Sequence, residues 1–581
     1  MILLINQNTL KFRTLMKLIH KVLLVCTYIL FFISNLKAQN NLNYSFDVNK
    51  ISEKIDNLLM DYSSKEAGIS IGIVINNELV IQKQLGLANL EHQIPITRET
   101  SFHVASVSKQ FTAFAILQLE NEGKLSLNDD IRKYIPQLNE FENRITINNL
   151  LNHTSGIKDE FNLLRLSGWR SNDFIANDHV LNILYNQTSL NFEPNENFMY
   201  SNSGYTLLAE IVARVSGMKF SEYTEKYIFK PLKMYNTQFV DKEGQIIKTK
   251  ANSYYKDGQF YIEDVFNNTR YGATNLSTTI EDLSKWIINF NKKEVGDSSL
   301  FDKMHSQKKL NNGNTYGYAN GQVIDNYKGV KRISHSGQDA SYQAYIGRFP
   351  DLGISIIFFD NNSEIDVRKV VGQLTEICLS DYLENKNYTK TSEILLSKKT
   401  PIIKAVKSLK KYEGYYWNDE DRYSRQLKIQ NDTLQYVRNE NDKTALIPVD
   451  ENEFEMVFDE YVSVSFQSNQ MVVTENDGYQ TTLDKYIPAD YNSNSLKQFV
   501  GKYYSPELNT FYTFLVENNI LVANHTRLGN FNLNAIKKDF FIGNKGSIRK
   551  VVFLRNELGK IVGLNISSSR AKNVEFHKLS E

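Results

Sequence analysis

A change in hydrophobic pattern near residue 400 constrains the fold of this 581-residue chain more than any other feature. Between about 45 and 385, apolar residues at helical spacing alternate with short runs typical of strands, which indicates layered α/β structure. Residues 386–404 are rich in Lys, Ser and Thr and are predicted to be a linker. Beyond them, short strand patterns separated by Asn, Asp and Gly dominate. We therefore expect a mixed domain over 39–385, followed by all-β structure.

The all-β tail contains an internal repeat. Two sets of residues are related by a constant offset of 87 positions: Leu409, Tyr412, Gly414 and Tyr416 recur as Leu496, Phe499, Gly501 and Tyr503. A constant offset is typical of a duplicated unit. The repeat predicts two all-β domains, 405–490 and 491–581, each a small antiparallel barrel.

The mixed domain is predicted to begin and end with a helix, because apolar residues fall at helical spacing near 51–59 and 367–383. Strand patterns lie between them, at 69–75, 79–85, 344–349 and 354–360. The first two strands are separated by Asn76-Asn77, which indicates a hairpin. These elements predict an α/β (α+β) sandwich with an antiparallel sheet.

Residues 1–38 have the layout of a secretory signal peptide. Lys17 and Lys21 precede an apolar run over 22–33, and small residues follow, ending at Ala38. The run is shorter than the roughly 18 to 20 residues that span a bilayer. We expect a periplasmic or secreted protein with no stable membrane span once the leader is removed; the alternative is an uncleaved N-terminal membrane anchor.

Charge and cysteine content exclude several classes of protein. The net charge is +1, from 67 Lys and Arg against 66 Asp and Glu, so no overall field attracts nucleic acid. Removal of the leader takes Cys26 and leaves Cys378, whose apolar surroundings predict a buried side chain. None of the nine histidines has metal-site spacing, and there is no glycine-rich phosphate loop. We expect no nucleic acid, metal or cofactor.

The segment from Ser106 to Lys109 is the first of three short motifs with a chemical interpretation. The same S-x-x-K pattern also starts at Ser34, Ser155, Ser306, Ser408, Ser547 and Ser569. Only Ser106 lies after a predicted hairpin and at the start of an apolar helix, where positions i and i+3 share a face. Lys109 is therefore expected to reach the Ser106 hydroxyl, near free helix N–H groups that stabilise negative charge.

The second motif is Tyr200-Ser201-Asn202, predicted to lie in a loop before a helix. Tyr-x-Asn also occurs at 318–320, so the pattern alone is weak. A tyrosine whose pKa falls beside a lysine ammonium can take a serine proton and return it to a leaving group. Asn202 can hold a carbonyl group of the substrate.

The third motif, His335-Ser336-Gly337, precedes a predicted strand. Glycine allows a substrate to come close, and the N–H of Gln338 can form an oxyanion hole together with that of Ser106. His335 can bind a carboxylate when protonated or donate a hydrogen bond when neutral.

Taken in order, the motifs resemble the serine β-lactamase and penicillin-binding-protein family over about residues 45–385. Two further segments support the likeness: Leu150 to Gly156, and Gly272 to Thr278. Within that family the chain is most similar to class C β-lactamases, D-alanyl-D-alanine carboxypeptidases and D-aminopeptidases. The resemblance implies that Ser106 is the acylated nucleophile and that Lys109 and Tyr200 share proton transfer. It also implies that Asn202 orients the substrate, and that His335 to Gln338 form the facing strand, with His335, Ser336 and Gly337 binding the substrate.

The histidine at position 335 departs from class C β-lactamases, which typically have lysine there, whereas D-aminopeptidases and some carboxypeptidases of the group have histidine. It favours hydrolysis of D-amino-acid peptides or related amides and esters, including peptides derived from peptidoglycan. The two trailing β domains also resemble the arrangement in D-aminopeptidases. The alternatives are a class C-like β-lactamase or esterase, and a penicillin-binding or peptidoglycan-sensing protein with little turnover. Whether Lys109 or Tyr200 is the base stays open.

Overall fold

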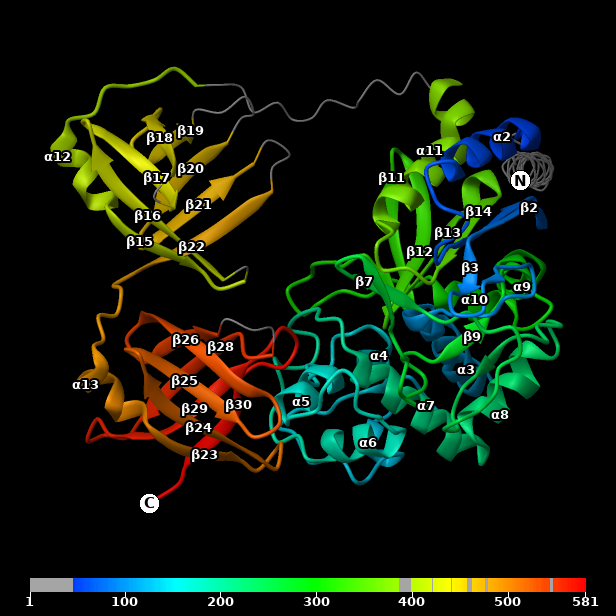
Figure 1. Ribbon diagram of the computed structural model, residues 1–581, viewed down its shortest axis with the longest axis horizontal. Coiled ribbons are helices and arrows are strands. Elements are labelled where there is room, and N and C mark those ends of the chain that lie inside the picture. The colour runs from blue at the N-terminus through cyan, green and yellow to red at the C-terminus, as the bar shows by residue number, and fades with distance from the viewer. Residues whose placement is uncertain are drawn as a thin grey trace, which may run out of the picture.

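The computed structural model describes residues 45–385, 399–420, 422–439, 441–456, 462–475, 479–543 and 547–580. The predicted signal peptide and most of the predicted linker lie outside these residues. The described chain forms a mixed α/β domain and two all-β barrels (Figure 1). Within the described residues, no helix is long and apolar enough to cross a membrane.

A seven-stranded antiparallel sheet is the centre of the mixed domain, in the order β10-β11-β12-β13-β14-β1-β2. Its strands are β1 (Ile69–Ile75), β2 (Glu78–Leu85), β10 (Tyr318–Ala319), β11 (Gln322–Tyr327), β12 (Val330–Asp339), β13 (Tyr342–Phe349) and β14 (Ile354–Asp360). The predicted hairpin turns at Asn76 and Asn77, whose φ angles are 48° and 68°. Strands from the two ends of the domain meet where β1 pairs with β14.

Helices cover both faces of this sheet. The first and last helices, α2 (Val48–Leu59) and α11 (Val367–Asn385), pack together on one face around a core that includes Ile55 and Leu374 (Figure 1). Cys378 is buried in this core, as predicted, and burial raises the pKa of its thiol to about 12. The predicted terminal helices are therefore one side of the sandwich.

The other face of the sheet carries a larger helical layer. It consists of α3 (Lys109–Asn121), α4 (Ile147–Leu151), α5 (Glu160–Leu166), α6 (Asn177–Tyr185), α7 (Asn202–Ser216), α8 (Phe220–Thr224), α9 (Ile280–Lys292) and α10 (Ser298–Met304). Helix α3 is buried on almost every side, which explains its apolar sequence. Because its first residue is Lys109, the helix places an amine inside the core region.

Each trailing β domain is a closed antiparallel barrel, as predicted, and each barrel has eight strands. The first contains β15 (Gly414–Asn418), β16 (Tyr423–Gln430), β17 (Thr433–Asn439), β18 (Asp442–Pro448), β19 (Glu453–Met456), β20 (Ser463–Gln467), β21 (Gln470–Thr474) and β22 (Gln480–Tyr486). The second contains β23 (Gly501–Ser505), β24 (Thr510–Glu517), β25 (Ile520–His525), β26 (Gly529–Lys537), β27 (Phe540–Gly543), β28 (Lys550–Arg555), β29 (Ile561–Ser567) and β30 (Val574–Lys578).

The sequence repeat has a structural counterpart at the start of each barrel. Gly414 and Gly501 have φ angles of 140° and 143°. The hydroxyl of Tyr416 donates to the Tyr412 carbonyl at 2.8 Å, and that of Tyr503 donates to the Phe499 carbonyl at 2.9 Å. The repeated residues thus build the same local structure twice.

The second barrel lies against α5 and α6 of the mixed domain (Figure 1). A buried ion pair joins Lys158 Nζ to Glu507 at 2.9 Å, and the Tyr512 hydroxyl donates to the Leu166 carbonyl at 3.0 Å. Apolar residues of the barrel and of the helical layer form one continuous core.

Candidate active site

Ser106 lies in a short 3-10 turn, η1 (Ala105–Ser108), directly before α3. The sequence pattern predicted that Ser106 would lie at the start of the helix itself. In the structure a sharp turn precedes the helix and contains Ser106. Ala105 has a φ of 44°, a conformation that costs an L-residue roughly 1 kcal/mol or more. The bend leaves Ser106 only partly buried, while Ala105 and Val107 on either side are buried.

Lys109 reaches Ser106, as its spacing predicted. Its Nζ lies 3.0 Å from Ser106 Oγ, 2.9 Å from Asn202 Oδ1 and 2.8 Å from the Ala273 carbonyl oxygen. The side chain is fully buried. Burial, and then the charge of Arg570, lower the pKa of Lys109 to about 7, while Glu160 and Asp159 raise it. The amine is therefore present in both protonation states near neutral pH.

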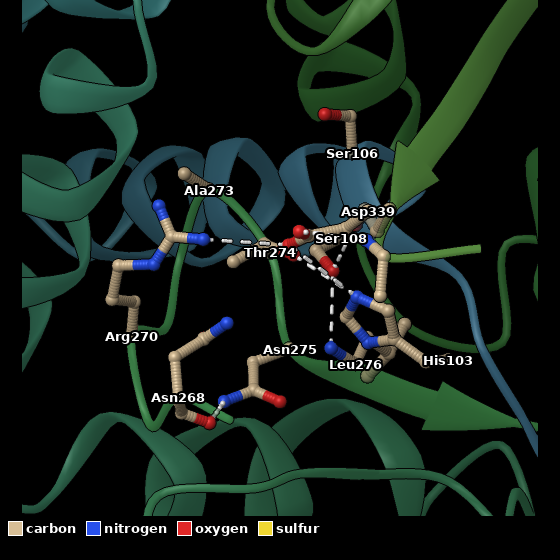
Figure 2. Close-up of polar contacts among 12 residues, drawn as sticks. His103, Ser106, Ser108, Asn268, Arg270, Ala273, Thr274, Asn275, Leu276 and Asp339 are labelled. Atoms are coloured by element: carbon tan, nitrogen blue, oxygen red, sulfur yellow. Dashed lines mark hydrogen bonds and ion pairs between the residues drawn. The ribbon is translucent and has the colours of Figure 1, made fainter. Parts of the chain in front are cut away.

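A buried polar network holds the segment that contains Ala273. Thr274 Oγ1 donates to Asp339 Oδ2 at 3.0 Å, and Arg270 lies 3.4 Å from the same oxygen. Ser108 Oγ accepts from the Leu276 N–H at 3.1 Å. Figure 2 shows this network on one side of Ser106, whose side chain points away from it. The network fixes the carbonyl that accepts from Lys109.

Tyr200 lies beside Lys109, whose Nζ is 4.9 Å from the centre of its ring. His153 packs on the same ring at 4.3 Å and accepts from the Ser201 N–H at 3.2 Å. Burial raises the pKa of Tyr200 above its usual value, and the hydrogen bond with Ser106 and the charge of Arg570 only partly oppose this. The expected fall in this pKa is therefore wrong, because burial outweighs the nearby cations. The phenol is protonated at neutral pH.

Asn202 is the first residue of α7, and its backbone N–H donates to Asp159 Oδ2 at 2.8 Å. Its Oδ1 accepts from Lys109. Among the described residues, no hydrogen bond is found from its Nδ2. This amide group can therefore donate to a substrate carbonyl, as the sequence suggested.

The third motif lies on β12, where His335 and Gly337 are buried and Ser336 and Gln338 are exposed. A Cβ on Gly337 would lie 3.0 Å from the Ser106 nitrogen, so the strand passes directly against η1. Pairing with β11 runs only to Ser334, which leaves 335–339 outside that pairing. The backbone N–H groups of Ser106 and Gln338 thus come from two segments in close contact.

His335 is held in its neutral form. Its Nδ1 lies 2.6 Å from the Ser336 carbonyl oxygen, and its Nε2 lies 3.2 Å from the Tyr318 hydroxyl. Burial, and then the charge of Lys109, lower the pKa of His335 to about 3, against the effect of the Ser336 hydrogen bond. Of the two roles considered from sequence, the structure favours hydrogen bonding over charge.

Several residues around the site were not identified from sequence. Tyr318, which appeared only as a second copy of the Tyr-x-Asn pattern, contacts His335 because β10 and β11 extend the sheet next to β12. His153 was noted within the Leu150 to Gly156 segment without a role. Asp159 and Arg570 gave no signal, although Arg570 lies inside the S-x-x-K pattern that starts at Ser569.

The fold and the serine–lysine pair are those of the serine β-lactamase and penicillin-binding-protein class. The Beta-lactamase family model matches residues 52–370, and the chain belongs to that family. Its two barrels follow the matched region.

Curated relatives match part of the chain. Penicillin-binding protein 4* of Bacillus subtilis is 29% identical over 305 residues, which are 49% of this chain and 66% of that protein. Protein flp of Staphylococcus aureus is 28% identical over 346 residues, 56% of this chain and 65% of the relative. The chain thus spans slightly less than two thirds of the length of these relatives.

Solved structures share the fold. The octameric penicillin-binding protein homologue from Pyrococcus abyssi is 24% identical with a TM-score of 0.50, covering 76% of this chain and all of the other. D-amino acid amidase from Ochrobactrum anthropi is 19% identical with a TM-score of 0.50, covering 58% of this chain and all of the amidase.

Proposed function

We propose that this chain is an exported serine hydrolase that forms an acyl-enzyme at Ser106 and cleaves D-amino-acid peptides or related amides and esters. The 3.0 Å contact between Lys109 Nζ and Ser106 Oγ carries the proposal. A buried amine with a pKa of about 7 can accept the hydroxyl proton at neutral pH, which an ordinary lysine cannot do.

In acylation, neutral Lys109 takes the proton of Ser106 while Ser106 Oγ bonds to the substrate carbonyl carbon. The N–H groups of Ser106 and Gln338 donate to the oxyanion. The Tyr200 hydroxyl gives its proton to the leaving group as the scissile bond breaks, and the Lys109 ammonium returns a proton to Tyr200. Water then attacks the ester by the same route in reverse, which restores Ser106. This assigns the base role to Lys109 and the acid role to Tyr200.

Substrate class rests on the polar groups that face the reacting centre. The Asn202 amide can hold the carbonyl next to the scissile bond, and neutral His335 offers no charge of its own. The fold neighbour from Ochrobactrum anthropi is a D-amino acid amidase, in agreement with this substrate class. Export rests on the signal-peptide pattern of residues 1–38.

The test is covalent labelling of the purified protein with a fluorescent penicillin, together with release of D-alanine from D-alanyl peptides. Ser106→Ala should abolish both. The matched control is Ser408→Ala, which alters an exposed serine of the same S-x-x-K pattern in the first barrel and should leave both intact. Labelling that persists in Ser106→Ala would refute the assignment. Stable labelling without peptide release would instead favour a penicillin-binding protein with little turnover.

A further inference from the structure

One loop of the second barrel reaches the active site. The hairpin between β29 and β30 lies against the mixed domain, where the Asp159 N–H donates to the Arg570 carbonyl at 2.9 Å. The side chain of Asn191 clamps the same loop: it donates to the Arg570 carbonyl at 3.0 Å and accepts from the Lys572 N–H at 2.7 Å. Asn162 Nδ2 donates to two further loop residues, Ser568 and Ser569. The loop is therefore fixed on the hydrolase domain.

This loop directs the side chain of Arg570 towards the reacting groups. Its guanidinium carbon lies 5.6 Å from the centre of the Tyr200 ring, the ring beside which Lys109 lies. The charge of Arg570 acts on the site, since it lowers the pKa of Lys109. A residue of the barrel is thus part of the electrostatic environment of Ser106.

The donors of Arg570 remain available to a ligand. Its Nη1 lies 3.6 Å from Asp159 Oδ2, longer than a hydrogen bond, and that oxygen already accepts from the Asn202 N–H at 2.8 Å. Within the described residues, the guanidinium makes no hydrogen bond. Its side chain is 31% exposed, whereas that of Asp159 is 0% exposed. The charge of Asp159 can orient the arginine, while the N–H groups of the guanidinium stay free of hydrogen bonds to it.

The basic side chains His335 and Lys109, which also lie near Ser106, are poorly suited to bind an anion. His335 is neutral, and the Lys109 amine already contacts three acceptors. Arginine keeps its charge at any physiological pH and matches a carboxylate with two parallel N–H donors.

We propose that Arg570 is a specificity-determining residue whose guanidinium binds a carboxylate on the leaving group of the substrate. The leaving-group side follows from Tyr200, because the arginine lies beside the residue that gives its proton to that group. The inference rests on the proposed acyl-enzyme chemistry and adds the residue that selects the substrate. In this arrangement the second barrel completes the binding site.

The test uses the full chain and two N-acetyl-D-alanyl thioesters, one with thioglycolate as the leaving group and one with its methyl ester, followed by thiol release. Arg570→Gln should raise KM for the acid roughly 10- to 100-fold, the range for a hydrogen-bonded charge, and leave KM for the methyl ester nearly unchanged. Arg570→Lys should recover part of the affinity. The control Lys572→Ala removes an exposed charge from the same loop and should change neither compound.

A binding measurement separates this inference from the chemistry on which it rests. Calorimetry with Ser106→Ala compares N-acetyl-D-alanyl-D-alanine with its C-terminal amide, with and without Arg570→Gln. The acid should bind more tightly than the amide only when Arg570 is present, whether or not Ser106 is the nucleophile. Three results would overturn the role of Arg570. Arg570→Gln could raise KM equally for the acid and the methyl ester, it could weaken binding of the acid and the amide equally, or neither dipeptide could bind.

Discussion

Gly337 and Val104 lie so close together that a Cβ added to Gly337 would stand 2.3 Å from the Val104 carbonyl oxygen. The Val104 oxygen is a backbone atom and cannot give way cheaply, so Gly337→Ala must push β12 away from η1. The two backbone N–H groups expected to bind the oxyanion would then separate. We expect acylation by a fluorescent penicillin to fall roughly 100-fold or more, as for the loss of one oxyanion-hole donor. The control is Gly372→Ala in α11, where an added Cβ would meet no atom within 4 Å apart from its chain neighbours and its own helix backbone; a similar fall there would contradict the explanation.

The pKa of Lys109 predicts the pH dependence of the reaction. Since the neutral amine is the base, kcat/KM for the neutral methyl ester should rise as pH increases through about 7 and then level off. Arg570→Gln removes a positive charge that lowers this pKa, so the midpoint should move to higher pH. Initial rates between pH 5 and 9 measure both. A midpoint that stays fixed would show that Arg570 does not act on Lys109.

The proposed acid role of Tyr200 predicts different losses for different leaving groups. Tyr200→Phe removes the proton donor, so hydrolysis of a D-alanyl amide should fall roughly 100- to 10,000-fold. A p-nitrophenyl ester has a leaving group that departs without a proton and should lose much less. Steady-state kinetics on the two substrates provide the comparison. Equal losses would assign Tyr200 to positioning.

The ion pair between Lys158 and Glu507 predicts a large stability effect at the domain interface. Lys158→Ala leaves a buried carboxylate without its partner and should lower the free energy of unfolding by roughly 3 to 5 kcal/mol. Replacing both residues, by Met and Leu, should recover most of this loss. Denaturant unfolding measures each variant.

The partly exposed pair between Lys550 and Asp419, which joins the two barrels, is the control for that measurement. Its removal by Lys550→Ala should cost less than about 1 kcal/mol, since solvent screens both charges. An equally small effect of Lys158→Ala would show that the second barrel is not anchored by its buried pair.

Local patterns predicted much of this molecule. The strand at 354–360, the hairpin at Asn76-Asn77 and the contact from Lys109 to Ser106 depend on short-range periodicity, and the structure contains each of them. The two barrels followed from a repeat within the chain. Such features can be predicted from sequence because residues close together in the chain form them.

The rest depends on packing between distant segments. Tyr318 joins the site because its short strand extends the sheet beside β12. Arg570 joins it because a barrel docks on α5. A short-range sequence pattern does not predict a contact between two domains. The pKa of Tyr200 rises where a lysine neighbour suggested a fall, because burial depends on the whole fold.

The matching geometry of Gly414 and Gly501 has an evolutionary consequence. A tandem duplication gives a protein two copies of one scaffold, and the loops of each copy can change while its barrel strands stay paired. The hairpin of the second copy carries Arg570 to the catalytic centre. Changes in substrate preference among descendants of this protein can therefore arise in a segment outside the hydrolase domain, through substitutions in one surface hairpin that leave the catalytic motifs intact.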